Sequence, residues 1–222
     1  MRRLIFPVLM GVIGVGILVA LGVWQVQRLG QKEALIARIE AKIGAAPVAV
    51  PASPEPEADR YLAVTAEGRL TGREVHVLTS EGEPGYRVIA EIDTGDRRMM
   101  ADLGFVPQAD KDIARAAAPV TLTGNLHWPQ ETDRFTPPPD PANIWFARDV
   151  PAMAQALATE PVLIVVRSLE GADLGVQPLP IDGALVRNDH REYAITWFSL
   201  AVVWAVMSMF FVLRMARDGR KD

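Results

Sequence analysis

Histidines are the side chains of this chain with the widest chemical range, because imidazole binds metals and transfers protons near neutral pH. None of the three is spaced with a carboxylate or a second histidine as the HExxH zinc motif requires. The chain contains neither a glycine-rich phosphate loop nor a GxSxG nucleophile. We therefore expect a protein that is not an enzyme. The histidines are His76, His127 and His190.

His190 differs from the other two because it lies where a polar segment meets the apolar stretch 193–213. At about 100° per residue, one helical face of this stretch carries the imidazole, small residues that form a shallow trough, and two tryptophans. A flat aromatic cofactor with an axial imidazole would fit such a face. The face comprises His190, Ala194, Trp197, Ala201, Trp204 and Ser208.

A second interpretation of these residues involves no cofactor. His190 is then an interfacial side chain that reaches toward water, and Tyr193 and Trp197 are anchors of the aromatic belt. The spacing alone leaves both interpretations open.

Two apolar stretches, 4–26 and 193–213, position these residues. Each runs for about 20 residues without a charge, which at about 1.5 Å per residue crosses a hydrocarbon core of about 30 Å. A cleaved signal peptide is the alternative for the first, since Arg2 and Arg3 form a basic start. No small-x-small cleavage site follows it, which favours an uncleaved anchor. We predict two transmembrane helices.

Two spans put both termini on one side of the membrane. Basic residues next to spans are retained in the cytoplasm, and both short tails are basic. Arg28, Lys32, Arg187 and Arg191 flank the spans on the far side and weaken this asymmetry. Because long loops are translocated largely regardless of charge, we expect cytoplasmic termini and an extracytoplasmic central domain.

The segment after the first span continues with helical periodicity over 27–43 and then becomes proline-rich over 46–56. We expect an amphipathic juxtamembrane helix followed by an extended, poorly packed tether. The chain then divides into a first span (1–28), a helix and tether (29–59), a central domain (60–187) and a second span with its basic tail (188–222).

The central domain is predicted to be β-rich, because short alternating runs are separated by Gly, Pro and Asp turns. One helix is expected over 150–158, with Asp149 as its N-cap and Pro151 near its start. We therefore predict a membrane-anchored α+β protein whose domain is a small β-sandwich or open barrel with one appended helix. The expected strands are 61–68, 74–78, 86–92, 98–103, 120–126, 143–146 and 163–166.

Charge and composition exclude several classes of function. Residues 27–192 hold 17 Lys and Arg against 25 Asp and Glu, a balance of about −8, so we expect no nucleic-acid partner. The absence of cysteine excludes disulfides, thiolate metal sites and iron–sulfur clusters.

The first apolar stretch also carries a glycine face. Gly11, Gly14 and Gly22 project within about 80° of one another, which permits close packing against the second span or a partner helix.

Four motifs in collinear order resemble the Surfeit-locus cytochrome c oxidase assembly factor family in its bacterial form. Residues 21–28 (LGVWQVQR) are similar to the family's LGxWQxxR, and 84–86 to its PGY turn. Residues 131–154 resemble its ExxxFTPxxD…NxWFxRD…MA block, and 188–201 its NxHxxYAxTWFxLA segment. The chain departs from the family where Leu103 and Phe105 replace the usual Arg and Trp, which puts any role of that arginine in doubt here.

The resemblance implies a multi-pass protein of the bacterial inner membrane with a periplasmic domain. It implies a role in building the haem a site of cytochrome c oxidase subunit I, with that subunit, other oxidase assembly proteins and the lipid bilayer as partners. His190 carries over as the candidate axial ligand of transiently bound haem a, near Trp197 and Tyr193. Arg191 or Arg187 could pair with haem propionates.

The FTP-containing block has two possible roles. Phe135, Trp145 and Phe146 could contact a partner from a docking loop stiffened by the triple proline 137–139. The block could equally be a turn that caps the core. Two functional alternatives also stay open: a membrane scaffold or chaperone that stabilises subunit I intermediates without cofactor, and an enzyme of haem or lipid modification.

The topology provides the first prediction. Alkaline phosphatase, which is active only outside the cytoplasm, should be active when fused near residue 100 and inactive when fused after the basic C-terminal tail. Phosphatase activity of whole cells, normalised to fusion protein, is the measurement. The reverse pattern would place His190 at the cytoplasmic boundary and contradict the cofactor interpretation.

Overall fold

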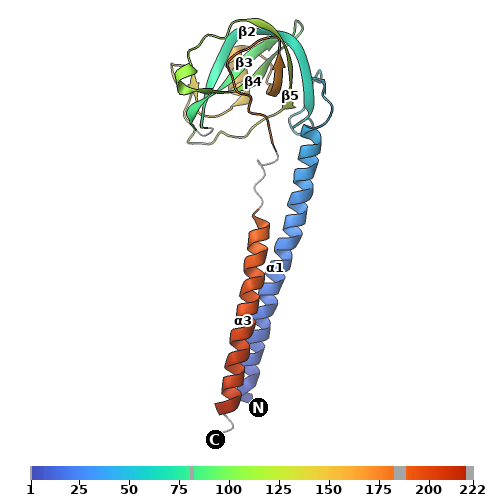
Figure 1. Cartoon of the computed structure of the whole chain (residues 1–222), viewed down its shortest axis with the longest axis vertical. Helices are drawn as coiled ribbons and strands as arrows, with labels where there is room; N and C mark the ends of the chain where they lie inside the picture. The colour runs from blue at the N-terminus through green and yellow to red at the C-terminus, as the bar shows by residue number, and fades with distance from the viewer. Residues whose placement is uncertain (1, 81–82, 183–188, 219–222) are drawn as a thin grey trace. The chain divides into compact units, whose positions relative to one another are not determined.

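The computed structural model describes residues 2–80, 83–182 and 189–218 (Figure 1). The chain forms two compact units. The described residues up to 38 and from 189 onward make a helical unit, and those between 39 and 182 make a sheet unit. Arg187 and Asn188, which belong to the predicted site segment, lie outside the described residues.

The helical unit consists of α1 (Arg2–Ile43) as far as Arg38 and of α3 (His190–Asp218), which run side by side in Figure 1. At about 1.5 Å per residue they extend for about 63 Å and 44 Å, more than the thickness of a hydrocarbon core. Both are long and apolar enough to cross a membrane by length and composition. Two terminal apolar helices that flank a mixed sheet domain are therefore present, as predicted.

Glycines on one face of α1 allow α3 to approach closely. A methyl carbon added at Gly11 would lie 2.9 Å from Cβ of Ser208, and one added at Gly22 would lie 2.7 Å from the Phe198 ring. At Gly14 the added carbon would overlap the indole of Trp204. The predicted close packing of this glycine face is confirmed, and its partner is the second apolar helix.

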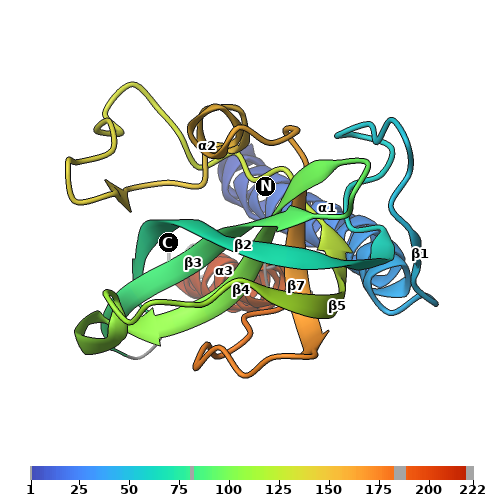
Figure 2. The same cartoon turned by 90° about the horizontal axis from the view of Figure 1, so that it is seen from above.

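The sheet unit is a closed barrel (Figure 2). Neighbouring strands pair in the order β2-β3-β4-β7-β5, and β5 pairs with β2 to complete the circuit. All pairs in this circuit are antiparallel except β4 with β7. The β-rich domain with one helix agrees with the prediction, but the sheet closes instead of forming a sandwich or an open barrel. The strands are β2 (Ala63–Ser80), β3 (Pro84–Asp93), β4 (Arg98–Pro107), β5 (Ala118–Leu126) and β7 (Leu163–Glu170).

β2 closes the barrel because one long strand serves two neighbours. Its register shifts between Leu70 and Glu74, where Gly72 has a φ of +84°. The irregularity bends the strand, so its first half pairs with β5 and its second half with β3. The sequence suggested two separate strands here, because the Gly72 turn interrupts the alternation.

Two apolar clusters hold the domain. The first fills the barrel with alternate residues of the strands, such as Val88, Ile92, Leu122 and Ile164. The second lies outside it, where α2 (Val150–Leu157) packs Met153 onto the barrel wall. The Asp149 carboxylate accepts a hydrogen bond from the Ala152 N–H at 3.1 Å, so the predicted N-cap is confirmed.

The proline-rich segment is packed against the barrel. Within it β1 (Val48–Ala49) pairs in parallel with β2, Val48 lying opposite Val64. The Arg97 guanidinium donates to the Pro51 carbonyl at 2.7 Å. The prediction of a poorly packed tether was wrong, because backbone pairing is available even to residues next to prolines.

The last turn of α1, which belongs to the sheet unit, is capped by side chains of β5 and β7. The predicted continuation beyond the apolar stretch is confirmed, since α1 is helical to Ile43. The Ile43 carbonyl accepts hydrogen bonds from the Asn125 amide at 3.1 Å and the Arg167 guanidinium at 3.0 Å. A cation at a helix C-terminus also stabilises the helix dipole.

The glycine packing provides the second prediction. Gly14→Leu should separate the helices, because its side chain would meet Trp204. Gly16→Leu is the matched control, since an added carbon there meets nothing within 4 Å. The measurement is cross-linking by a short bis-maleimide of a Val15→Cys/Ala205→Cys pair, which lines one hollow between the helices, in a chain with no other cysteine. We expect a yield several-fold lower with Gly14→Leu than with Gly16→Leu, and equal yields would contradict the packing.

Candidate functional site

A hydrogen bond between the two apolar helices holds His190 in place. Its Nδ1 lies 2.7 Å from Oε1 of Gln25 on α1, 165 residues away in the chain. Gln25 is only 7% exposed, and His190 is half-buried at the first position of α3. The site therefore joins two segments that the sequence presented separately: 21–28 and the segment around His190.

The hydrogen bond also determines the chemistry that the imidazole can perform. An amide oxygen only accepts hydrogen bonds, so this contact uses a hydrogen on Nδ1. In a neutral ring with that hydrogen, Nε2 carries the lone pair. Histidines that bind metals usually donate their other ring N–H in this way to an oxygen acceptor. The contact with Gln25 is compatible with the tautomer in which Nε2 is free to bind a metal.

The predicted trough on α3 is covered. Ala194 and Ala201 are 6% and 5% exposed, and Ser208 and Trp204 face Gly11 and Gly14 of α1. In this arrangement the glycine face of α1 packs into the trough. The binding of a flat cofactor near His190 stays a prediction. Nε2 of His190 could bind a metal, but Ala194, Ala201 and Ser208, farther along the same face of α3, pack against α1.

The other predicted site residues of α3 have different surroundings. Trp197 is half-buried, while Tyr193 is 55% exposed and Arg191 is exposed. The structure brings together His190 and Gln25, and it turns Tyr193 and Arg191 outward.

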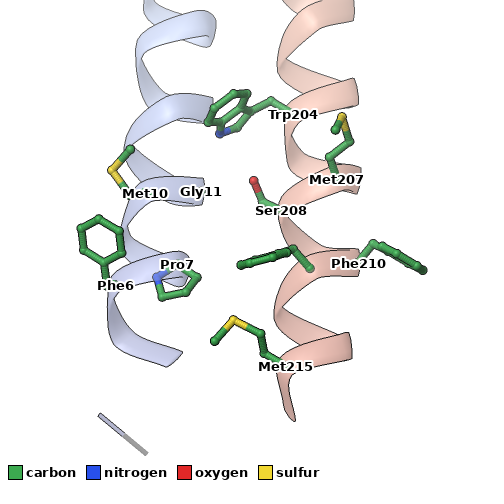
Figure 3. Close-up of a pocket in the computed structure, with 10 residues that line it drawn as sticks. Phe6, Pro7, Met10, Gly11, Trp204, Met207, Ser208, Phe210 and Met215 are labelled. Carbon is green, nitrogen blue, oxygen red and sulfur yellow. The ribbon is translucent and has the colours of Figure 1, made fainter. Parts of the chain in front are cut away.

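A large apolar hollow lies farther along the helices and is separate from His190. It has a volume of about 740 Å³ and is lined by both α1 and α3. Figure 3 shows Trp204 and Ser208 pointing toward α1 at this level. Trp204 follows His190 by 14 residues, which is about 21 Å along the helix axis. A metal bound by His190 would therefore not lie in this hollow.

The FTP-containing block combines a packed half and an exposed half. Trp145, in β6 (Ile144–Trp145), is 7% exposed and belongs to the cluster under α2. Phe135 is 74% exposed and Phe146 is 42% exposed. Of the three aromatic residues considered for partner contacts, Phe135 and Phe146 offer their rings to solvent, while Trp145 supports the core.

An ion-pair network holds this block on the barrel. The fully buried Asp102 carboxylate accepts from Arg87 at 2.7 Å and from Arg148 at 3.3 Å. Arg148 also forms a bidentate pair with Glu131. Burial alone would raise the pKa of Glu131, but the hydrogen bonds and charge of Arg148 together lower it. This half of the block therefore caps the domain.

Sequence reasoning did not identify this network. In the sequence, Glu131 and Arg148 are positions of the FTP-containing motif with no assigned role, and Arg87 and Asp102 lie outside the motifs. Their strand alternation was the available signal, since Arg87 and Asp102 lie on the strand faces opposite to Val88 and Leu103.

The two departures from the family pattern are core residues. Leu103 is 3% exposed inside the barrel. Phe105 is 4% exposed, and its ring lies so close over Gly85 that a Cβ there would overlap it. An aromatic side chain is thus kept above the glycine of the PGY turn, although the type of ring has changed.

Gln25 appears in the sequence analysis only as a position of the LGxWQxxR motif, although a further signal pointed to it. It follows Gly14 by 11 residues, so it projects within about 20° of that glycine on a helical wheel. A polar side chain on a close-packing glycine face must find a partner on the opposing helix.

The fold and the site define a class of protein: a barrel domain flanked in sequence by two terminal apolar helices, with a histidine held at the interface of these helices. The sequence profile described as the SURF1 family matches residues 12–202. The chain belongs to the SURF1 family.

Individual relatives agree over most of the chain. A SURF1-like protein from Monosiga brevicollis is 33% identical over 86% of this chain and 81% of its own length. A SURF1-like protein from Rickettsia felis is 26% identical over 88% of this chain and 92% of its own length. Surfeit locus protein 1 from Homo sapiens is 28% identical over 82% of this chain and 69% of its own length.

A second histidine, His127, is buried beside the ion-pair network. Its ring stacks on Tyr61 at 5.4 Å, and its Nδ1 has no hydrogen-bond partner within the described part of the chain. Burial, reinforced by the charges of Arg148 and Arg60, lowers the pKa of His127 to about 4. The domain therefore holds this imidazole neutral.

The third prediction follows from that shift. Between pH 6.5 and about 4 the unfolded chain binds a proton at His127 that the folded chain refuses, so stability falls as the pH falls. His127→Phe keeps a ring against Tyr61 and should remove about 2 kcal/mol of the stability difference between pH 7.5 and pH 4.5. Urea unfolding of the barrel in detergent, followed by circular dichroism, measures this.

The control is His190→Ala, which removes a histidine outside the barrel and should leave the pH difference intact. An unchanged pH difference in His127→Phe would show that other groups cause it.

Proposed function

We propose that this protein is an assembly factor for a haem–copper cytochrome c oxidase and that it helps deliver haem a to subunit I. Family membership supports the general assembly role. The observation that favours haem is the 2.7 Å hydrogen bond from His190 to Gln25, which directs the Nε2 lone pair away from the acceptor. The protein acts in this proposal as a carrier and not as an enzyme.

The half-buried His190 could bind a haem iron through Nε2. Haem a, when bound, would supply that iron and its redox chemistry. His190 would provide that nitrogen, Gln25 would hold the ring, and the exposed Arg191 could pair with a propionate. A single half-buried histidine suits a carrier, because transfer requires a ligand bond weak enough to break.

The setting of this proposal is the bacterial inner membrane. The lengths of α1 and α3 support two spans, and the basic tails support cytoplasmic termini with the barrel in the periplasm. His190 would then lie at the outer boundary of the bilayer.

Subunit I and other assembly proteins are the proposed partners of the barrel. The exposed Phe135 and Phe146 beside the triple proline favour the FTP-containing block as the contact, since aromatic residues dominate interface energetics. The rigid network through Arg148 would hold that block ready to bind, which lowers the entropy cost of association.

A scaffold that stabilises subunit I without cofactor is the alternative. The covered trough favours it, because the face first expected to cradle a cofactor is occupied by α1. Co-purification of subunit I that does not depend on haem a supply distinguishes the scaffold from the carrier.

The fourth prediction tests the carrier. Protein purified from cells that make haem a should show the absorption bands of bound haem, and His190→Ala should retain less by more than roughly tenfold, because the axial bond is lost. Val203→Ala, an exposed change in the same helix outside the 188–201 motif, is the control and should match the wild type. Equal haem in wild type and His190→Ala would refute the ligand role.

A further inference from the structure

We propose that Gln25 is the positioning residue of this site: it selects the tautomer of His190 and sets how strongly the imidazole can bind a metal. This inference rests on the proposed function where it concerns haem, but its first step concerns the imidazole alone. It assigns a chemical role to a residue in the helix opposite the histidine.

Burial is the first support. Gln25 is 7% exposed, whereas its neighbours Trp24 and Val26 are each 49% exposed. The amide therefore points into the helix interface, although a glutamine could satisfy its polar groups better in water. Burying an amide costs free energy unless it is hydrogen-bonded, so its contact with His190 has to be maintained.

The surroundings of the pair are the second support. One turn before Gln25, Gly22 admits the Phe198 ring, which brings α3 close to α1. One turn after His190, Ala194 is 6% exposed in the same interface. Apolar packing thus limits the rotation of both side chains, and the low dielectric strengthens their hydrogen bond.

Chemistry is the third support. Gln25 as acceptor requires the hydrogen on Nδ1, which leaves Nε2 as the basic nitrogen. An oxygen that accepts from Nδ1 also raises the electron density of the ring and hence the strength of the Nε2–metal bond. A neutral amide does this more weakly than a carboxylate, which suits a ligand that must release its cargo.

The fifth prediction uses three variants. Gln25→Leu removes the acceptor, Gln25→Glu replaces it with a stronger one, and Gln27→Leu is the matched control, because Gln27 is exposed two residues along the same helix. In protein purified without haem, ¹⁵N NMR of labelled histidine near pH 8.5 distinguishes the two tautomers. We expect Nδ1–H in wild type, Gln27→Leu and Gln25→Glu, and loss of that preference in Gln25→Leu.

Binding of haem a provides the second readout. Gln25→Leu should weaken it by roughly tenfold, as is common for the loss of a partner behind a metal ligand. Gln25→Glu should retain haem and lower its midpoint potential, because a stronger donor favours ferric iron. A purely structural clasp would change thermal stability in Gln25→Leu without moving the tautomer or the potential, and that result would overturn the inference.

The two proposals fail differently. If His190→Ala retains all its haem while the tautomer still depends on Gln25, the ligand role is lost and the positioning role stands. If His190→Ala loses its haem but Gln25→Leu matches the wild type in tautomer, affinity and potential, only the role of Gln25 is lost.

Discussion

Close approach of two helices over a glycine face is the constraint on which the helical unit depends. Gly11 and Gly22 have no side chains, so Ser208 and Phe198 of α3 can sit directly against the backbone of α1. The close approach of the two helices lets the side chains of Gln25 and His190 reach each other, so that Oε1 of Gln25 and Nδ1 of His190 lie 2.7 Å apart. The same approach fills the trough on α3, so one packing arrangement both creates the histidine site and removes a bed for a flat ligand.

The sheet unit solves a different problem, the stability of a small domain without disulfides. A bend in β2 at Gly72 closes the sheet, which removes the edges at which strands of other chains could pair. Closure gives an apolar interior, and α2 adds a second apolar layer outside. Charged side chains on the outer face of the barrel are buried where they lie beside α2. The Asp102 carboxylate is tolerated there because Arg87 and Arg148 both form ion pairs with it.

The ion-pair network around Arg148 explains why one half of the FTP-containing block is packed and the other half is exposed. Arg148 joins Glu131 to the barrel wall, and Trp145 packs under α2, so one half of the block is part of the domain core. Phe135 is held out in solvent by the same framework. The alternatives of a core-capping turn and a docking loop therefore apply to different residues of one segment.

Sequence alone determined the features that depend on local chemistry. Two runs without charges marked both apolar helices, alternation marked most strands, Asp149 marked the start of α2, and the glycine spacing marked a packing face. Only tertiary structure decided which face Gln25 would meet, that the trough would be covered, that the sheet would close and that Asp102 would be paired twice. These outcomes depend on residues far apart in the chain, and periodicity reports which face a residue occupies but not what lies opposite it.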